Sequence, residues 1–298
     1  MALLERAVQI LARNGHTVTV APTTGPGTAG AIAREHIARG AGLIVTAGGD
    51  GTVNEVLEGM VHTSVPLAIL PAGTANVLAM EMKLGARIER VAERLEECRP
   101  CRIPVGRLLA GGGRVDRHFM LMAGIGLDAY IVANVNLAIK QRIGKLAYWV
   151  AGWSLLGKRL EHFGVEANGH RRECSFALVS KVRNYGGDFE IARNVSLLDD
   201  EFEVVLLEGR TTVRYVKYFA GMALNRLAGM KGATVLRSDR VVLTPPAGSR
   251  IAVQIDGEFA GYLPAEVRIV PDALTLLIPP EYIRAAHAPA LAQGGKSL

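Results

Sequence analysis

The stretch Ala47-Gly48-Gly49-Asp50-Gly51-Thr52-Val53-Asn54-Glu55 decides the fold. It follows the apolar run 43–46, which is typical of a buried strand, and leads into apolar residues at helical spacing over 53–60. Three glycines and an aspartate therefore stand where a strand turns into a helix. Glycine lets the backbone approach a ligand closely, and the free amides of a helix N-terminus favour an anion such as phosphate. The aspartate would repel phosphate unless a cation lay between them, which predicts a nucleotide with Mg²⁺.

The spacing of these glycines excludes two commoner phosphate-binding turns. The P-loop, G-x-x-x-x-G-K-[ST], requires a lysine that does not follow here, and the dinucleotide fingerprint G-x-G-x-x-G does not match G-G-D-G-T. A simpler interpretation is a tight strand–helix turn in which Asp50 or Thr52 caps the helix that follows.

A second turn of small residues follows the next predicted strand. The apolar run 66–70 leads into Pro71-Ala72-Gly73-Thr74-Ala75-Asn76, and a helix is expected over 77–82. In a doubly wound sheet, ligands bind outside the carboxyl ends of the strands. We therefore expect the two turns to frame one site.

These blocks together resemble the diacylglycerol kinase catalytic-domain family, which includes bacterial lipid kinases and sphingosine kinases and is related to the NAD kinases. The resemblance continues, in the family's order, through the blocks AGIGLDA (123–129), NYGG (184–187), LDD (198–200) and QIDGE (254–258). It implies a Rossmann-like α/β nucleotide domain followed by a C-terminal β-sandwich domain. The expected division is an α/β domain over 1–101, a β-sandwich lipid domain over 102–284 and a flexible tail over 285–298.

The pattern along the chain agrees with that α/β plus β architecture. Helix and strand patterns alternate up to about residue 97, beginning with a helix over 2–14 and a strand over 16–20, which implies a parallel sheet. From residue 102 short strand-like runs separated by turn signals indicate antiparallel β structure, with helical insertions at about 127–158 and 212–229.

Composition limits the partners. The chain has 298 residues, a net charge of +6 and a pI near 9.4. It lacks the dense Lys/Arg runs with interleaved aromatic residues that mark nucleic-acid binding, so no nucleic-acid partner is expected and the charge favours an anionic membrane surface. Because its longest apolar stretch is shorter than the ~20 residues that span a bilayer, a cytoplasmic location is expected, with peripheral association at the inner membrane face.

The resemblance implies an ATP- and Mg²⁺-dependent lipid kinase that phosphorylates a hydroxyl of a diacylglycerol-like or related lipid. Asp50 would act in a water network around Mg²⁺, a role that is compatible with capping a helix. The resemblance places a nucleotide-contacting threonine at Thr23, and an ordinary turn hydroxyl is the equal alternative for this residue. The expected nucleotide-binding residues are Thr23, Gly48, Gly49, Asp50, Gly51, Thr52, Asn54, Gly73 and Thr74.

The acidic run after Leu198 is the expected structural metal site. The family's corresponding turn holds Mg²⁺ through an aspartate and backbone carbonyls, which here match Asp200 with the carbonyls of Leu197 and Phe202. The family usually has glycine where this chain has Glu201, and a glutamate would be strained there if the position needs a positive φ. A solvated acidic turn is the alternative.

The Asp-Gly pair within 255–259 predicts a β-hairpin. The family uses this hairpin to bring carboxylates to the donor phosphate, and Glu258 matches its proposed proton acceptor. Asp256 is the alternative base or a partner. Two carboxylates this close can raise the pKa of one of them, which suits a base working near neutral pH.

The chain also departs from the family. The family's first strand and its Asn-Pro turn are missing, so either the start is truncated or the sheet lacks a strand and exposes an edge that a homodimer partner could cover. That loss would lower ATP affinity or abolish activity. Val77 stands where many relatives have aspartate, so one carboxylate is missing from a possible Mg²⁺ water network. The missing turn keeps a non-catalytic nucleotide- or lipid-binding homologue as one rival. An NAD kinase-like enzyme, which shares the GGDGT turn, is the other.

The segment 139–149 mixes cationic, apolar and aromatic residues, and it suits an interfacial or a half-buried helix equally.

Overall fold

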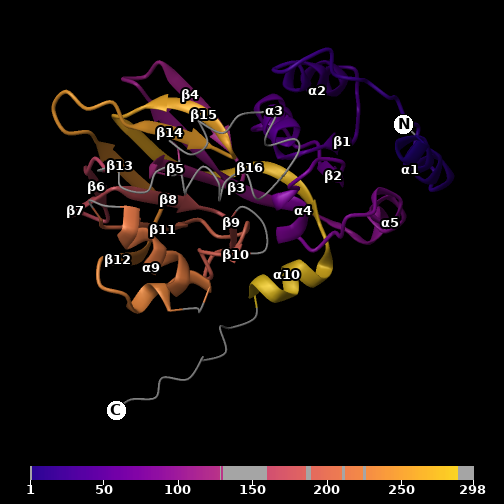
Figure 1. Cartoon of the computed structure of the whole chain (residues 1–298). Coiled ribbons are helices and arrows are strands. Elements are labelled where there is room, and N and C mark those ends of the chain that lie inside the picture. Colours follow the sequence, from indigo (N-terminus) through magenta and orange to yellow (C-terminus); the bar gives the residue numbers. More distant parts are fainter. Residues whose placement is uncertain are drawn as a thin grey trace.

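The computed structural model describes residues 2–127, 129, 160–185, 189–209, 212–223 and 226–287. Over this part of the chain the backbone forms one sheet of eight strands, one of six and a small pair (Figure 1). The insertion predicted over 127–158 lies almost wholly outside the described residues, as does the segment 139–149.

The N-terminal region alternates helices with parallel strands, as predicted. Strands β1 and β2 pair in parallel, with Ile44 opposite Leu67. Helix α3 forms where the helical spacing of apolar residues predicted it and buries that face, including Leu57 and Met60. The elements are α1 (Ala2–Arg13), α2 (Ala29–Ala38), β1 (Ile44–Gly48), α3 (Asp50–Met60), β2 (Leu67–Pro71), α4 (Val77–Glu81), α5 (Ile88–Glu93) and η1 (Leu95–Glu97).

The strand predicted over 16–20 is absent, and that prediction is wrong. This segment runs without secondary structure between α1 and α2, and Val20 is 58% exposed. A strand needs a hydrogen-bonded neighbour, and among the described residues β1 pairs with β2 alone and ends the sheet. The edge that the sequence predicted therefore lies at β1.

The C-terminal region is antiparallel, as predicted. The six-stranded sheet has the order β12-β11-β8-β5-β14-β15, and it packs on the larger sheet through buried side chains such as the stacked Phe119 and Phe202. Strand β13 alternates exposed and buried side chains, which is the period-two pattern of a strand with one face on a core. The strands are β3 (Arg99–Ala110), β4 (Val115–Phe119), β5 (Met122–Gly126), β6 (Phe163–Ala167), β7 (His170–Cys174), β8 (Phe176–Ser180), β9 (Asn184–Tyr185), β10 (Phe189–Glu190), β11 (Phe202–Leu207), β12 (Ala233–Ser238), β13 (Arg240–Thr244), β14 (Ala252–Ile255), β15 (Glu258–Tyr262) and β16 (Ala265–Ile278).

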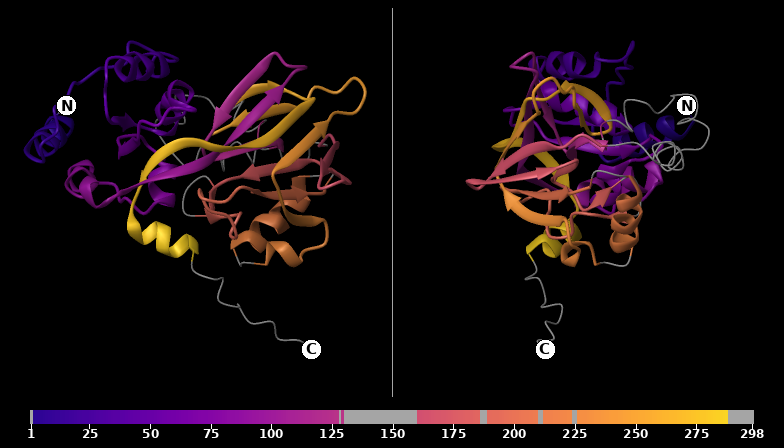
Figure 2. Two further views of the ribbon diagram at one scale, coloured as in Figure 1. Left: turned by 180° about the vertical axis from the view of Figure 1, so that it is seen from behind. Right: turned by 60° about the vertical axis from the view of Figure 1, so that its left-hand side comes forward.

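Two long strands join the two regions. Strand β16 pairs antiparallel with β3 along most of its length, and at its far end Leu276 pairs in parallel with Leu67 of β2. Figure 2 shows β16 running from the sandwich to the helical end of the molecule. One sheet therefore passes through both regions, and one buried cluster combines Leu57 of α3 with Val205 of β11.

Two described helices lie in the C-terminal half besides the short η2 (Leu227–Gly229). Helix α9 (Thr212–Ala223) falls within the insertion predicted over 212–229. Helix α10 (Pro280–His287) extends past residue 285, so the predicted tail begins too early; its buried Tyr282 anchors the helix. None of the helices among the described residues has the length and apolar character needed to cross a bilayer.

Candidate functional site

The two small-residue turns touch each other. The amide of Ala72 donates to the carbonyl oxygen of Gly48 (3.1 Å). A β-carbon placed on Gly73 would lie 2.4 Å from Cα of Gly49, a distance that no folded chain allows. Glycine is required here because the turns approach each other, in addition to any approach of a ligand. The predicted pairing of the two turns in space is a feature of the structure.

Asp50 joins the turns through its side chain. Its Oδ2 accepts from the amide of Val77 (3.0 Å) and its Oδ1 from the amide of Leu78 (3.1 Å). The carboxylate therefore caps α4. The simpler interpretation, in which Asp50 or Thr52 caps α3, is wrong because Gly49 is the N-cap of α3 and that helix has no side-chain cap.

The N-terminus of α3 offers free donors. The first intrahelical bond runs from the amide of Val53 to the carbonyl of Gly49. The amides of Asp50, Gly51 and Thr52 donate to no group within the described part of the chain. Free amides at this end of a helix of 11 residues can bind an anion.

The second turn is held by Asn76. Its side chain accepts from the amide of Gly73 (2.9 Å) and donates to the carbonyl oxygen of the same residue (2.7 Å). Asn76 has φ of 50°, the left-handed conformation that asparagine tolerates better than most residues. Thr74 is exposed at the tip of this turn, where a ligand could reach its hydroxyl.

Glu55, which the sequence interpretation overlooked, orders the segment after Thr23. Its carboxylate accepts from the amides of Gly27 (2.7 Å) and Ala29 (3.1 Å), and so caps α2 from α3. Thr23 is exposed in that segment. Asn54 is buried instead, and neither atom of its amide group has a hydrogen-bond partner among the described residues. The structure thus keeps Asn54 away from the surface that the other nucleotide-site candidates share.

The predicted hairpin is present. Asp256 and Gly257 both have positive φ, 48° and 81°, as a two-residue type I′ turn requires, and Ile255 lies opposite Glu258. The carboxylate of Asp256 points back into the sandwich, where it accepts from three backbone amides, those of Met120 (2.9 Å), Leu121 (3.0 Å) and Met122 (2.9 Å).

The environment of Asp256 perturbs its acidity. The pKa of Asp256 is raised to about 7, chiefly by burial; the three backbone amides oppose this rise, and the negative charge of Asp50 adds to it. The residue as a whole keeps some solvent exposure, yet its carboxylate oxygens face the protein. Asp256 therefore holds the hairpin against the sandwich through its bonds to the backbone, and its pKa depends on the charge of Asp50.

Glu258 faces the first turn. A β-carbon placed on Gly51 would lie 3.0 Å from its Oε1. Its Oε2 accepts from Nη2 of Arg117 in β4 (3.0 Å). The neighbouring His118 is tied to Glu58 of α3 through its backbone amide (2.6 Å) and its ring Nδ1 (3.1 Å). These bonds hold strand β4 against α3. Arg117, for which no sequence motif predicted a role, therefore lies at the site.

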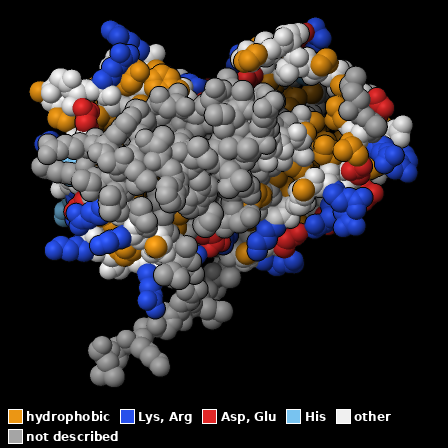
Figure 3. Space-filling view, in the orientation of Figure 1, with side chains coloured by type: hydrophobic (Ala, Val, Ile, Leu, Met, Phe, Trp, Pro, Cys, Tyr) orange, Lys and Arg blue, Asp and Glu red, His pale blue; other side chains and the backbone are white. Residues whose placement is uncertain are grey.

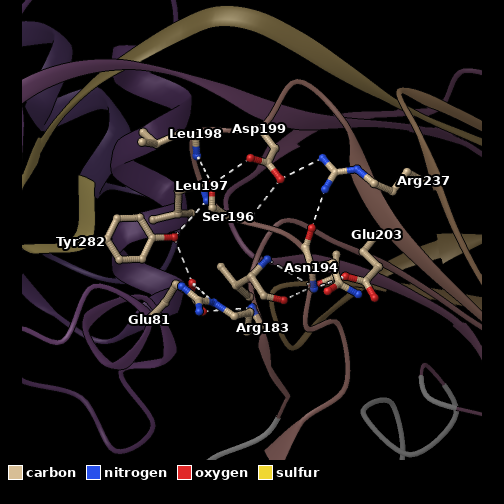
Figure 4. Close-up of polar contacts among 12 residues, drawn as sticks. Glu81, Arg183, Asn194, Ser196, Leu197, Leu198, Asp199, Glu203, Arg237 and Tyr282 are labelled. Carbon is tan, nitrogen blue, oxygen red and sulfur yellow. Dashed lines mark hydrogen bonds and ion pairs between the residues drawn. The ribbon is translucent and has the colours of Figure 1, made fainter. Parts of the chain in front are cut away.

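The acidic turn, defined here as residues 197–201, lies elsewhere. Figure 4 shows Asp199 between Ser196 and Arg237: its carboxylate accepts from Oγ of Ser196 (2.9 Å) and from Nη2 of Arg237 (2.8 Å). Asp200 is exposed. Mg²⁺ binding by Asp200 and the carbonyls of Leu197 and Phe202 stays a prediction.

The acidic turn meets the far end of α4. The amide of Leu197 donates to the hydroxyl of Tyr282 (3.0 Å), and that hydroxyl donates to Oε1 of Glu81 (2.9 Å) (Figure 4). Arg183 binds the same carboxylate through its backbone amide (2.9 Å) and its Nε. Helix α4 therefore contacts the nucleotide turns at one end and the sandwich at the other.

The surface around α1, α2 and α3 is uneven. In the space-filling view, the molecule is hollowed on the right-hand side, and hydrophobic side chains gather in that hollow (Figure 3). This side carries the helical end of the chain, where β1 ends the sheet.

Comparison with known proteins agrees with this geometry. The family model described as "Diacylglycerol kinase catalytic domain" matches residues 1–108, and that described as "YegS C-terminal NAD kinase beta sandwich-like domain" matches residues 122–278. A diacylglycerol kinase of Mycobacterium tuberculosis (strain H37Rv) is 26% identical over 248 residues, which are 82% of this chain and 79% of that protein. A diacylglycerol kinase of Bacillus subtilis (strain 168) is 26% identical over 270 residues, 88% of this chain and 86% of that protein.

Solved structures share the fold. The crystal structure of a diacylglycerol kinase from Bacillus anthracis str. Sterne superimposes with a TM-score of 0.76 at 20% identity and covers 94% of this chain and 92% of that one. The two family models together account for nearly all of the described chain, and the second alone matches more than half of its length. The chain therefore belongs to the diacylglycerol kinase catalytic-domain family, in the branch that carries a YegS-type C-terminal β-sandwich.

Proposed function

We propose that the chain is an ATP- and Mg²⁺-dependent lipid kinase that transfers the γ-phosphate of ATP to a hydroxyl of a diacylglycerol-like or related lipid. Membership of the family supports a lipid kinase in general. The observation that carries the proposal is the position of Glu258 Oε1 beside Gly51, at the N-terminus of α3. A proton acceptor and a phosphate-binding turn then face each other, as transfer to a hydroxyl requires.

The donor phosphates would lie on the first turn. The free amides of Asp50, Gly51 and Thr52 point out of the N-terminus of α3, where the helix dipole favours negative charge. Thr74, exposed on the neighbouring turn, would donate its hydroxyl to the same ligand. Asp50 keeps the two turns together through its bonds to α4.

The acceptor hydroxyl would lose its proton to Glu258. This carboxylate is half exposed and its Oε1 faces the turn, whereas the oxygens of Asp256 are occupied by three backbone amides. We assign Asp256 the positioning of the hairpin and Glu258 the role of base. Arg117 orients Glu258 through its ion pair and brings a positive charge next to the transferring phosphoryl group.

The residues at this site fit a Mg²⁺ that arrives with ATP. Asp50 and Glu258 lie at the turn, and the charge of Asp50 raises the pKa of Asp256 in the hairpin. No group of three His, Cys, Asp or Glu side chains in the described ranges could hold a metal by itself. Asp50 and Glu258 would therefore hold the ion through its water ligands, and the ion would supply charge neutralisation of the phosphates.

The acceptor would be presented at a membrane surface. The net charge of +6 favours an anionic lipid surface, because it attracts such a surface at long range. A second copy of the chain, covering the edge at β1, is part of the same proposal.

The test is transfer of label from γ-labelled ATP to a panel of lipids and to NAD. We expect label in a diacylglycerol-like lipid, and a fall in kcat of about 10²-fold or more for Glu258→Gln, since a general base contributes that much. Circular dichroism and the urea midpoint of Glu258→Gln should match those of the unmodified chain, because the side chain is half exposed.

Other outcomes would revise the proposal. Full activity in Glu258→Gln with none in Asp256→Asn would exchange the two roles. Label in NAD alone would identify an NAD kinase-like enzyme. The free edge of β1 among the described residues favours one further candidate, a homologue that binds nucleotide or lipid without catalysis. Retained ATP binding with no transfer to any acceptor would establish it.

A further inference from the structure

A lysine ammonium group lies beneath the acidic turn. Lys181 follows β8 directly and is completely buried, with 0% of its surface exposed. Its backbone amide donates to the carbonyl oxygen of Leu121 (2.8 Å), which fixes where the side chain starts. Its Nζ donates to the carbonyl oxygen of Asp199, in the middle of the turn. A buried ammonium is stable only when oxygen atoms or negative charges surround it, and the acidic turn supplies both.

The turn already has its positive charges. Lys181 lies on its inner, buried side: burial lowers the pKa of its ammonium group to about 8, and the carboxylates of Asp199 and Asp200 oppose that shift. Arg237 of β12 also binds the turn, where it donates to Asp199 (2.8 Å) and Glu201 (2.9 Å), and it donates to the carbonyl oxygen of Asn194 as well. The positive charges of Lys181 and Arg237 therefore face the three carboxylates of the turn, those of Asp199, Asp200 and Glu201.

The expected Mg²⁺ donors do not fit a metal in this arrangement. Mg²⁺ demands an octahedral set of oxygen ligands at about 2.1 Å, and Asp200 is the only side chain expected to supply one of them. Glu201 is not among the residues with positive φ, so the turn does not take the conformation that glycine would permit. A divalent ion beside Asp200 would also be repelled by the buried ammonium of Lys181.

We propose that the ammonium group of Lys181 is the resident cation of the acidic turn and takes the place of a structural Mg²⁺. The turn then folds without a divalent metal. The chain carries its own counter-charge from β8, so the turn keeps its contacts with α10 and α4 through Leu197 and Tyr282 whatever the metal concentration.

The test is the metal dependence of stability in nucleotide-free protein at neutral pH. For the unmodified chain we expect the same urea midpoint in EDTA, Mg²⁺ and Ca²⁺, and no stoichiometric metal by elemental analysis after gel filtration. Lys181→Met keeps an unbranched side chain but removes the charge. It should lower the midpoint, and Mg²⁺ or Ca²⁺ should partly restore it, because the vacated turn can then accept a metal.

Two controls separate the interpretations. Lys217→Met removes an exposed lysine from α9 and should leave the midpoint unchanged. Asp200→Asn should change little if Lys181 is the cation, but should abolish any response to EDTA if a metal is held by Asp200. The proposal is overturned if EDTA lowers the midpoint of the unmodified chain and Asp200→Asn removes that response, or if Lys181→Met matches the unmodified chain. If Lys181→Met does not fold, the EDTA and metal-content measurements on the unmodified chain still decide.

Discussion

At the scale of single residues, Gly73 shows how steric exclusion shapes the site. Its missing side chain allows the second turn to lie directly on Gly49 of the first, where an added β-carbon would meet backbone at 2.4 Å. Backbone cannot rotate away as a flexible side chain can. The two turns hold their relative position because neither glycine carries a side chain.

Gly73→Ala should therefore separate the turns. We expect a loss of ATP affinity of at least tenfold, together with a lower urea midpoint, because relieving the contact must displace one turn. Isothermal titration with a non-hydrolysable ATP analogue measures the first effect. Gly42→Ala is the matched control, since a β-carbon there meets no atom within 4 Å. Equal affinities for the two variants would show that the contact does not matter.

Asp256 should make stability depend on pH. Its pKa is about 7 in the folded chain, against an ordinary value of about 3.9 in an unfolded chain. Between those values the folded state binds more protons than the unfolded state, so this group lowers the free energy of unfolding as pH rises.

Asp256→Asn removes that titration. The urea midpoint of the variant should therefore rise, relative to that of the unmodified chain, between pH values of about 4 and about 7. The comparison is made between two pH profiles, so a constant loss from weakened bonds to Met120, Leu121 and Met122 does not affect it. Parallel profiles would show that burial does not raise the pKa of Asp256.

At the scale of helices and strands, α3 organises its neighbours through its acidic side chains. Asp50 caps α4, Glu55 caps α2 and Glu58 binds His118 of β4. Each carboxylate satisfies amides that would otherwise lack a partner at a helix or strand end. Helix α3 therefore positions α2, α4 and β4 around the site.

Removing the cap on α4 should weaken the fold measurably. Asp50→Ala should lower the free energy of unfolding by about 1 kcal/mol, since two amides of α4 lose their acceptor. Asp50→Asn should lose less, because one acceptor oxygen remains. Urea unfolding measures both. Glu93→Ala, which removes an exposed carboxylate from α5, should be neutral. A neutral Asp50→Ala would contradict the cap.

Sequence patterns predicted several of these elements from local rules. Helical spacing predicted α3, the Asp-Gly pair predicted the β14–β15 hairpin, and the glycine-rich turns predicted the paired loops. The strand over 16–20 failed because a strand depends on a distant neighbour and no local pattern reports that neighbour. Arg117 and Lys181 escaped notice for the same reason, since their partners lie 141 and 18 residues away in the chain.

At the scale of the whole molecule, a continuous sheet and side-chain hydrogen bonds join the nucleotide region to the sandwich. Strand β16 continues the sheet from β13 to β2, and Tyr282 of the following helix binds both the acidic turn and α4. Helix α4 is capped at its other end by Asp50. A chain of bonds therefore runs from the first turn through α4 to α10 and the sandwich.

Tyr282 is the residue on which this connection can be tested. Its hydroxyl is buried, accepts from Leu197 and donates to Glu81, so Tyr282→Phe leaves a buried carboxylate and a buried amide each short of one partner. We expect a loss of about 1–3 kcal/mol in the free energy of unfolding. Hydrogen exchange should accelerate in α10, in α4 and in the acidic turn together. Tyr262→Phe is the matched control, because it deletes a hydroxyl with no hydrogen bond among the described residues and keeps its ring against Phe259. Exchange that accelerates in α10 alone would mean that Tyr282 holds this helix to the sandwich but does not connect the sandwich to α4. The nucleotide turns could then move independently of the acidic turn.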